Sequence, residues 1–74
     1  MIKQVNISNF ADVRKIVETA SKMPCDVGIH DFNDQIADAK SLLGMMSLSY
    51  SHPVKIVSED EYAVNKIASV ISGR

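Results

Sequence analysis

The sequence has little of what disulfide-bonded, metal-binding or nucleic-acid-binding proteins need. Its single cysteine, Cys25, cannot close an intramolecular disulfide, and no Cys/His cluster has zinc spacing, so we expect no metal. Eight basic and nine acidic residues give a formal net charge of −1, which excludes nucleic acid as an expected partner. No apolar run is long enough for a signal peptide or a membrane span. We therefore expect a cytoplasmic location and no membrane contact.

The chain is also too short for a multidomain enzyme. Its 74 residues correspond to one domain, residues 1–74. A chain of this length buries only about 60 % of the surface that it exposes when unfolded. That suffices for a thin core of two layers and not for a deep, enclosed active site. We expect a protein that is not an enzyme and that needs no cofactor.

Apolar periodicity predicts seven secondary-structure elements. Alternation of apolar and polar residues is typical of strands with one buried face, and spacing of three and four residues is typical of amphipathic helices. The expected elements are a strand at 2–7, a helix between residues 9 and 24, a strand at 26–30, its hairpin partner at 35–39, a short helix at 41–48, a strand at 54–57 and a helix after residue 58. Gly73 suits the C-terminal end of that last helix. This order implies an α+β fold of two layers.

Capping residues mark the helix ends. Ser8 and Asn9 are both favourable N-cap types, and Asp12 places a carboxylate in the first turn of the first helix, where the helix dipole favours it. Charged residues, Asp12 among them, are expected away from the apolar face of this helix, which carries Phe10, Val13, Ile16, Val17 and Ala20. Ser58 and Glu61 match a capping box at the start of the last helix.

One segment carries a family resemblance. Residues 38–48 read Asp-Ala-Lys-Ser-Leu-Leu-Gly-Met-Met-Ser-Leu. This is similar to the Lys-Ser-x-x-Gly-x-Met-Ser-Leu segment of HPr, the histidine phosphocarrier of the bacterial sugar phosphotransferase system, and Thr19–Lys22 resembles the end of the first helix of that family. The resemblance covers nearly the whole chain, with one residue inserted in the 30–37 hairpin. It implies an open-faced sandwich of order β-α-β-β-α-β-α, in which three helices cover one face of a four-stranded antiparallel sheet.

Asn9 stands where this family has its phosphoryl-accepting histidine. Counting back without gaps from Ala20–Lys22 also puts Ala11 at the family's arginine position and Asp12 at its proline position. A phosphoryl acceptor needs an available lone pair, which the amide nitrogen of asparagine does not offer. Asp12 would repel an anion, and no arginine is matched to hold one. We therefore expect no phosphoryl transfer at this position.

No other residue is an obvious substitute for the missing histidine. His30 falls in a predicted strand and His52 in the loop before Pro53. Neither lies at a helix N-terminus or has a basic neighbour to hold a phosphate, so we expect exposed or capping histidines. Cys25, beside a proline, is expected to be a small buried hydrophobe.

Ser41 is the candidate for regulation. In some bacteria the matching serine of HPr is phosphorylated by a dedicated kinase, and the product is a regulatory signal. A phosphate at a helix N-cap meets free amides and the positive end of the dipole, and Lys40 is adjacent. The alternative is that Ser41 only caps the helix.

The short helix has more apolar residues than one face can bury: Leu42, Leu43, Met45, Met46 and Leu48. We expect Met45 and Leu48 in the core and the other three partly exposed. In the family, the residues that match Leu42, Leu43 and Met46 form an exposed apolar patch that docks partner proteins, a use to which methionine is well suited.

Two functions of different classes stay open. The residues favour a regulatory or protein-interaction module without carrier chemistry, which binds a protein partner, such as a phosphotransferase-system or regulatory protein, through the apolar patch. The alternatives are a phosphocarrier with a non-standard acceptor and a structural homodimer. Phe10, at the opening of the first helix, adds to the partner surface either as a hydrophobic plug or through a staple-like contact.

Overall fold

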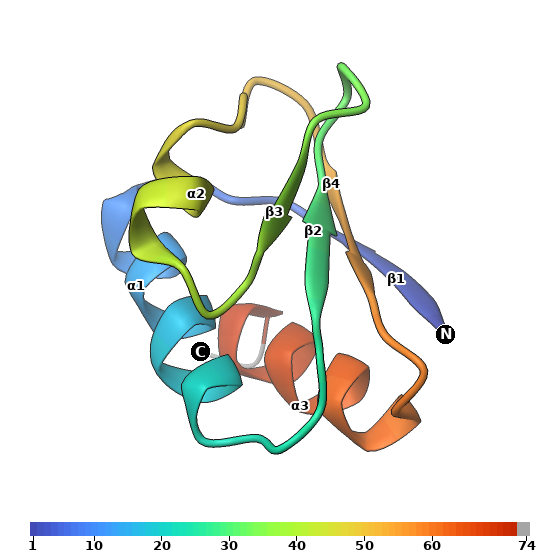
Figure 1. Cartoon of the computed structure of the whole chain (residues 1–74). Helices are drawn as coiled ribbons and strands as arrows, with labels where there is room; N and C mark the ends of the chain where they lie inside the picture. Colours follow the sequence, from blue (N-terminus) through green and yellow to red (C-terminus); the bar gives the residue numbers. More distant parts are fainter. Residues whose placement is uncertain (73–74) are drawn as a thin grey trace.

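The computed structural model describes residues 1–72, and the helix end that Gly73 is expected to close lies outside them. Its elements follow the predicted order β-α-β-β-α-β-α (Figure 1). They are β1 (Ile2–Val5), α1 (Phe10–Ser21), β2 (Gly28–His30), β3 (Ile36–Asp38), α2 (Leu42–Met46), β4 (Val54–Val57) and α3 (Glu61–Ser72). Within residues 1–72, none of the helices is both long enough and apolar enough to cross a membrane.

The four strands form one antiparallel sheet in the order β1-β4-β2-β3. The last strand of the chain therefore lies between the first two, with Val54 opposite Val5 and Ile56 opposite Ile29. β2 and β3 form a hairpin, in which Ala37 lies opposite Ile29. Residues that are far apart in the sequence become neighbours across β4.

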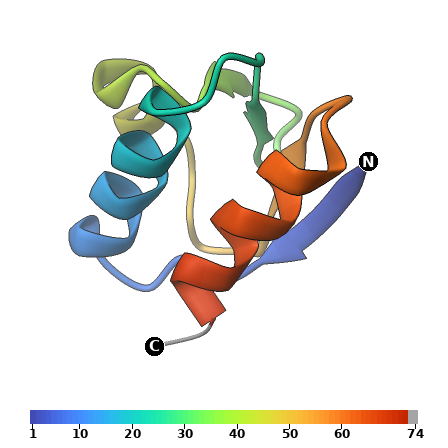
Figure 2. The ribbon, with the colours of Figure 1, turned by 90° about the horizontal axis from the view of Figure 1, so that it is seen from below.

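All three helices cover the same face of this sheet (Figures 1 and 2). Successive residues of a strand point to opposite faces. In β4, Val54 and Ile56 are buried and Lys55 between them is exposed; in β2, Ile29 is buried and His30 is half-buried. The α+β open-faced sandwich predicted from the sequence is confirmed.

The core fills the space between the sheet and the helices. Ile16 of α1, Met45 of α2, Ile56 of β4 and Ile67 of α3 are completely buried there. Side chains of this size contribute about 1.5–3 kcal/mol each when they leave water. One layer of such residues holds α1 and α3 against the sheet.

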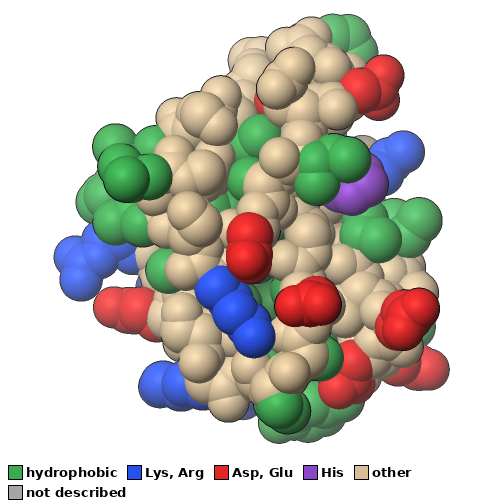
Figure 3. Space-filling model, viewed as in Figure 1, with side chains coloured by type: hydrophobic (Ala, Val, Ile, Leu, Met, Phe, Trp, Pro, Cys, Tyr) green, Lys and Arg blue, Asp and Glu red, His purple; other side chains and the backbone are tan. Residues whose placement is uncertain are grey.

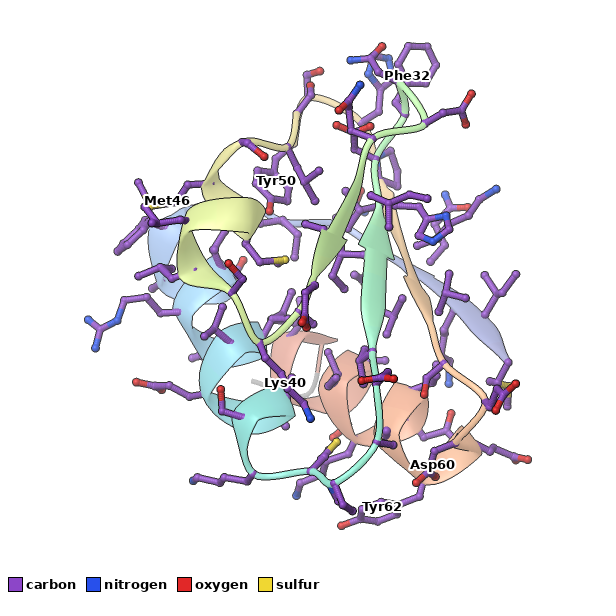
Figure 4. The ribbon with its side chains drawn as sticks, in the orientation of Figure 1. Phe32, Lys40, Met46, Tyr50, Asp60 and Tyr62 are labelled. Carbon is purple, nitrogen blue, oxygen red and sulfur yellow. The ribbon has the colours of Figure 1, made fainter. Side chains whose placement is uncertain are left out.

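The predicted capping box at the start of α3 is wrong. Asp60 caps this helix instead, because its Oδ1 accepts two first-turn N–H groups at 2.9 and 3.4 Å (Figure 4). The Ser58 hydroxyl is not available to Glu61, since it donates to the Asp26 carbonyl at 2.8 Å and accepts from the Asp60 N–H at 3.1 Å. Four predicted elements are also longer than the observed ones: β1 ends at residue 5 rather than 7, and β2, β3 and α2 cover only residues 28–30, 36–38 and 42–46.

Candidate functional site

Asn9 closes the first turn of α1 with its own side chain. Its backbone is extended, and its Oδ1 accepts a hydrogen bond from the Asp12 N–H at 3.0 Å. Of the two candidate caps, Asn9 is therefore the N-cap. Ser8 contributes its backbone N–H, which donates to Asp12 Oδ2 at 3.1 Å. These two opposed hydrogen bonds close the turn in the manner of a capping box.

The Asp12 carboxylate is buried in this turn, and only 1 % of the residue is exposed. The prediction that Asp12 lies away from the buried face of the helix is wrong, because the carboxylate turns back toward the Ser8 N–H. A negative charge here is stabilised by the positive end of the helix dipole. An external anion at the start of α1 would meet this charge first, and the neighbouring Ala11 offers no cation to hold it.

An apolar groove of about 380 Å³ lies between the start of α1 and the end of α2. Its lining consists of Ile7, Ser8, Asn9, Phe10, Val13, Met46 and Tyr50. Phe10 is 51 % exposed and forms a wall of the groove. The prediction that it shares the buried face of α1 is wrong, and that face starts at Val13.

Tyr50 fixes one side of the groove, although the sequence analysis gave it no role. Its hydroxyl donates to the Met45 carbonyl in the last turn of α2 (Figure 4). Burial, together with the negative charge of Asp31, raises the pKa of Tyr50 to about 12. Tyr50 is thus a neutral hydrogen-bond donor at every physiological pH, and it holds α2 against the rest of the domain.

Ser41 caps α2, as predicted. Its Oγ accepts the Gly44 N–H at 3.1 Å, and Ser41 is half-buried. A Cβ at Gly44 would lie 3.2 Å from that oxygen, so glycine leaves room for the cap. The ammonium of Lys40 is already engaged, since it donates to the Met23 carbonyl at 2.9 Å (Figure 4).

The exposed apolar residues of α2 are the predicted ones. Leu43 is 82 % exposed and Met46 is 56 % exposed, and Leu42 is also exposed, whereas Met45 and Leu48 are buried. Figure 3 shows hydrophobic side chains gathered on the α2 side of the molecule. Because Met46 also lines the groove beside α1, the α2 surface and the groove form one continuous apolar area, called here the α1–α2 patch: Phe10, Leu42, Leu43 and Met46.

The two histidines lie elsewhere. His30 is on the open face of the sheet, and the ring of His52 stacks on Phe32 with centroids 4.1 Å apart. Both line a second depression, which includes neither Asn9 nor any other residue of α1. The prediction that neither histidine has a basic neighbour is wrong for His30, because Lys55 is its cross-strand partner.

No metal centre is present in the part of the chain that the structure describes. Residues 1–72 contain no group of three or more His, Cys, Asp or Glu side chains that could hold a metal ion. Cys25 packs against the core but is half-buried rather than buried as predicted.

Comparison with known proteins gives the family. Residues 12–72 match the family described as "PTS HPr component phosphorylation site". The chain belongs to the HPr family. Its fold agrees with two solved members. The phosphocarrier protein HPr from Bacillus anthracis str. Ames has a TM-score of 0.79 at 22 % identity, over 97 % of this chain and 96 % of that one. HPr-C-His from Thermoanaerobacter tengcongensis has a TM-score of 0.82 at 25 % identity, over 99 % and 92 %. No curated protein matches the sequence.

The HPr match begins at Asp12 and so leaves out Asn9. The inward carboxylate of Asp12 and the anchoring role of Tyr50 were both missed by the sequence analysis. One signal was available for the first: Asn9 and Asp12 are three residues apart, the spacing at which an N-cap and its partner exchange hydrogen bonds. The sequence analysis did not single out Tyr50, although its partner, the Met45 carbonyl, lies only five residues earlier.

Proposed function

We propose that this HPr-family chain is a protein-interaction module of the phosphotransferase system that carries no phosphoryl group and catalyses no reaction. The observation that supports this most strongly is the closed first turn of α1. Asn9 uses its amide oxygen to cap the helix, and the Asp12 carboxylate accepts the Ser8 N–H. A carrier needs the opposite arrangement, with a nucleophilic nitrogen and free amides at that turn.

Charge adds to the chemical argument. A phosphoryl group that approached Asn9 would be repelled by the buried carboxylate of Asp12, and displacing that carboxylate would cost its hydrogen bond and its interaction with the helix dipole. Ala11 offers no guanidinium to hold a phosphate.

The α1–α2 patch is the proposed docking surface. HPr-family proteins interact with proteins of the phosphotransferase system, and the patch is contiguous with the start of α1. Three of its members project from α2 and one from α1, and all four are exposed. Exposed apolar residues concentrated on so small a molecule favour a protein partner. A cytoplasmic location is part of this proposal.

Ser41 acts as a helix cap in this proposal, and its phosphorylation is the regulated alternative. Its Oγ, the Gly44 N–H and the Lys40 ammonium all have partners already, which favours the capping role. A phosphate could replace the hydroxyl as acceptor for the Gly44 N–H. Incubation with ATP and the HPr serine kinase separates the two: label that is present in the parent protein and lost in Ser41→Ala establishes the switch, and no label establishes the cap alone.

Binding to the first enzyme of the phosphotransferase system tests the docking surface. Leu43→Asp should weaken this binding at least about tenfold, because a charge would be buried in an apolar interface. Tyr62→Asp is the matched control, since Tyr62 is 68 % exposed on α3, away from the patch (Figure 4). Equal binding by both variants, each with unchanged circular dichroism, would refute the assignment of the patch.

One observation favours the alternative of a carrier with a non-standard acceptor. Lys55 lies opposite His30, so one imidazole does have a cation beside it. The structural homodimer is the other alternative, and a second copy would then cover the patch. Sedimentation at several concentrations decides this point: a monomer at all concentrations excludes the homodimer.

A further inference from the structure

A row of polar side chains crosses the open face of the sheet. Gln4 of β1, Lys55 of β4 and His30 of β2 are successive cross-strand partners. Residues directly opposite one another in an antiparallel pair have Cβ atoms about 4.5–5.5 Å apart. The three side chains therefore stand side by side on adjacent strands, on the face that carries no helix.

None of these three side chains has a polar partner within the described residues. Within residues 1–72, the Lys55 ammonium, the His30 ring and the Gln4 carboxamide form no hydrogen bond or ion pair; the ion pair of this part of the chain joins Arg14 and Glu18. A carboxylate directly opposite a lysine would stabilise the strand pair. Here both of its cross-strand neighbours can instead donate N–H groups alongside it.

Aromatic side chains wall this row at one end. The row lines a depression of about 270 Å³ together with the stacked rings of Phe32 and His52. Figure 3 shows a histidine on this side of the molecule, surrounded by hydrophobic side chains and a basic one. This volume is below that of pockets that bind drug-sized ligands, so the expected ligand is smaller than those.

Asp31 makes the wall rigid. One of its carboxylate oxygens accepts the N–H groups of Asn33 and Gln35, each at 2.9 Å, and the other accepts the Ser49 N–H at 2.9 Å. The hairpin loop that carries Phe32 is thereby joined to the segment that leads to His52. The N–H donors engage both oxygens of this carboxylate and stabilise its charged form, which lowers its pKa.

One further carboxylate lines the depression. Asp34 occupies the tip of the β2–β3 hairpin, with the positive φ of 63° that Asp tolerates in a tight turn. Its charge opposes an anion in the depression, whereas the charge of Lys55 favours one. The floor formed by the three strands thus offers N–H donors, and the acidic group lies in the loop at the rim.

We propose that this depression binds the phosphate group of a small organic phosphate monoester. The Lys55 ammonium, a His30 ring N–H and the Gln4 amide N–H donate to the phosphate oxygens, and the organic part contacts the Phe32–His52 stack. Charge-assisted hydrogen bonds of this kind are the stronger ones in proteins. The proposal is independent of the closed turn of α1, which shares no residue with this depression.

Titration followed by amide and side-chain NMR shifts tests the site, with inorganic phosphate and phenyl phosphate as probes and phenol as the neutral control. Both phosphates should shift the signals of residues 4, 30 and 55, phenyl phosphate should bind more tightly, and phenol should cause no shift at the three polar residues. Lys55→Gln should weaken binding about fivefold, as expected for one solvent-accessible ionic contact. Lys66→Gln, which removes the same charge from exposed α3, should leave binding unchanged.

Two further variants make the result decisive. Asp34→Asn should tighten binding, because it removes the opposing charge, and Phe32→Ala should affect phenyl phosphate and not inorganic phosphate. Equal losses in Lys55→Gln and Lys66→Gln, or weaker binding in Asp34→Asn, would overturn the site. Shifts confined to residues 8–12 would also overturn the site, because they would show that phosphate binds at the start of α1. That result would contradict the proposed closure of α1 as well.

Discussion

The Asp12 carboxylate accepts a hydrogen bond from the Ser8 N–H at 3.1 Å, so α1 carries its own anion at its N-terminus. The charge is buried and forms part of the helix cap rather than of a solvent-facing site. This relationship gives α1 a cap built from residues of its own first turn: Asn9 Oδ1 accepts the Asp12 N–H, and the Asp12 carboxylate accepts the Ser8 N–H.

Removal of the Asp12 carboxylate should destabilise the protein. Asp12→Ala leaves the Ser8 N–H without its acceptor and removes a favourable charge from the helix terminus, at a cost of about 1–3 kcal/mol in the free energy of unfolding. Asp12→Asn keeps an acceptor oxygen and should lose less. Urea denaturation of the three proteins measures both differences. A change below about 0.5 kcal/mol in Asp12→Ala, the range of ordinary surface substitutions, would show that the carboxylate is not part of the cap.

The Asp31 carboxylate should make stability depend on acid pH. Hydrogen bonds from the Ser49, Gln35 and Asn33 N–H groups hold the pKa of Asp31 below its ordinary value of 3.8, against the opposing effect of burial. A lowered pKa in the folded state means that the stabilisation is fully present above the ordinary pKa and is lost as the pH falls through the folded value. The urea midpoint of Asp31→Asn, followed from about pH 6 to about pH 2, should therefore fall less steeply than that of the parent. Parallel profiles would contradict the role assigned to these three bonds.

Tyr50 should make stability depend on alkaline pH. Its pKa is raised from 10.0 to about 12 in the folded protein, so the unfolded chain releases this proton first and stability falls between these two values. Tyr50→Phe should lose about 1 kcal/mol at neutral pH with the hydrogen bond to the Met45 carbonyl. It should also show a shallower alkaline decline. A decline as steep as that of the parent would exclude Tyr50 as its source.

Adjacent methionines on α2 should respond in opposite ways. Met45 is fully buried, and Met45→Ala should cost about 2–5 kcal/mol of stability through lost contacts and a cavity. Met46 is exposed in the α1–α2 patch, so Met46→Ala should change stability by less than about 0.5 kcal/mol and weaken partner binding. Chemical denaturation and the binding assay with the first enzyme measure the two effects. A large loss of stability in Met46→Ala, together with little change in Met45→Ala, would show that the core and docking faces of α2 are assigned the wrong way round.

Local patterns were sufficient where neighbours in sequence decide the structure. The alternation of Val54, Lys55 and Ile56 identified β4 and its two faces, and Ser41 was found as the cap of α2 because its hydrogen-bond partner is three residues away. The exposure of Leu43 followed from an excess of apolar residues over the area that one short helix can bury. These features depend on spacing alone.

Other features depend on contacts between distant segments. Ser58 could not serve in its predicted capping box because its hydroxyl bonds to the carbonyl of Asp26, 32 residues earlier. The neighbourhood of His30 and Lys55 arises because β4 inserts between β1 and β2, a choice of strand order that no local pattern encodes. The same topology creates the depression on the open face of the sheet.

The intact mass of the protein, measured after incubation with phosphoenolpyruvate and the first enzyme of the phosphotransferase system, tests the central claim most directly. A histidine-bearing HPr in the same reaction is the positive control and should gain one phosphoryl group. This chain should keep its original mass, because the Asn9 amide is not a phosphoryl acceptor and the Asp12 carboxylate would repel a second anion at this turn. An acid-labile phosphoryl group on this chain, abolished by His30→Gln or by His52→Gln, would contradict the account and establish a carrier with a different acceptor.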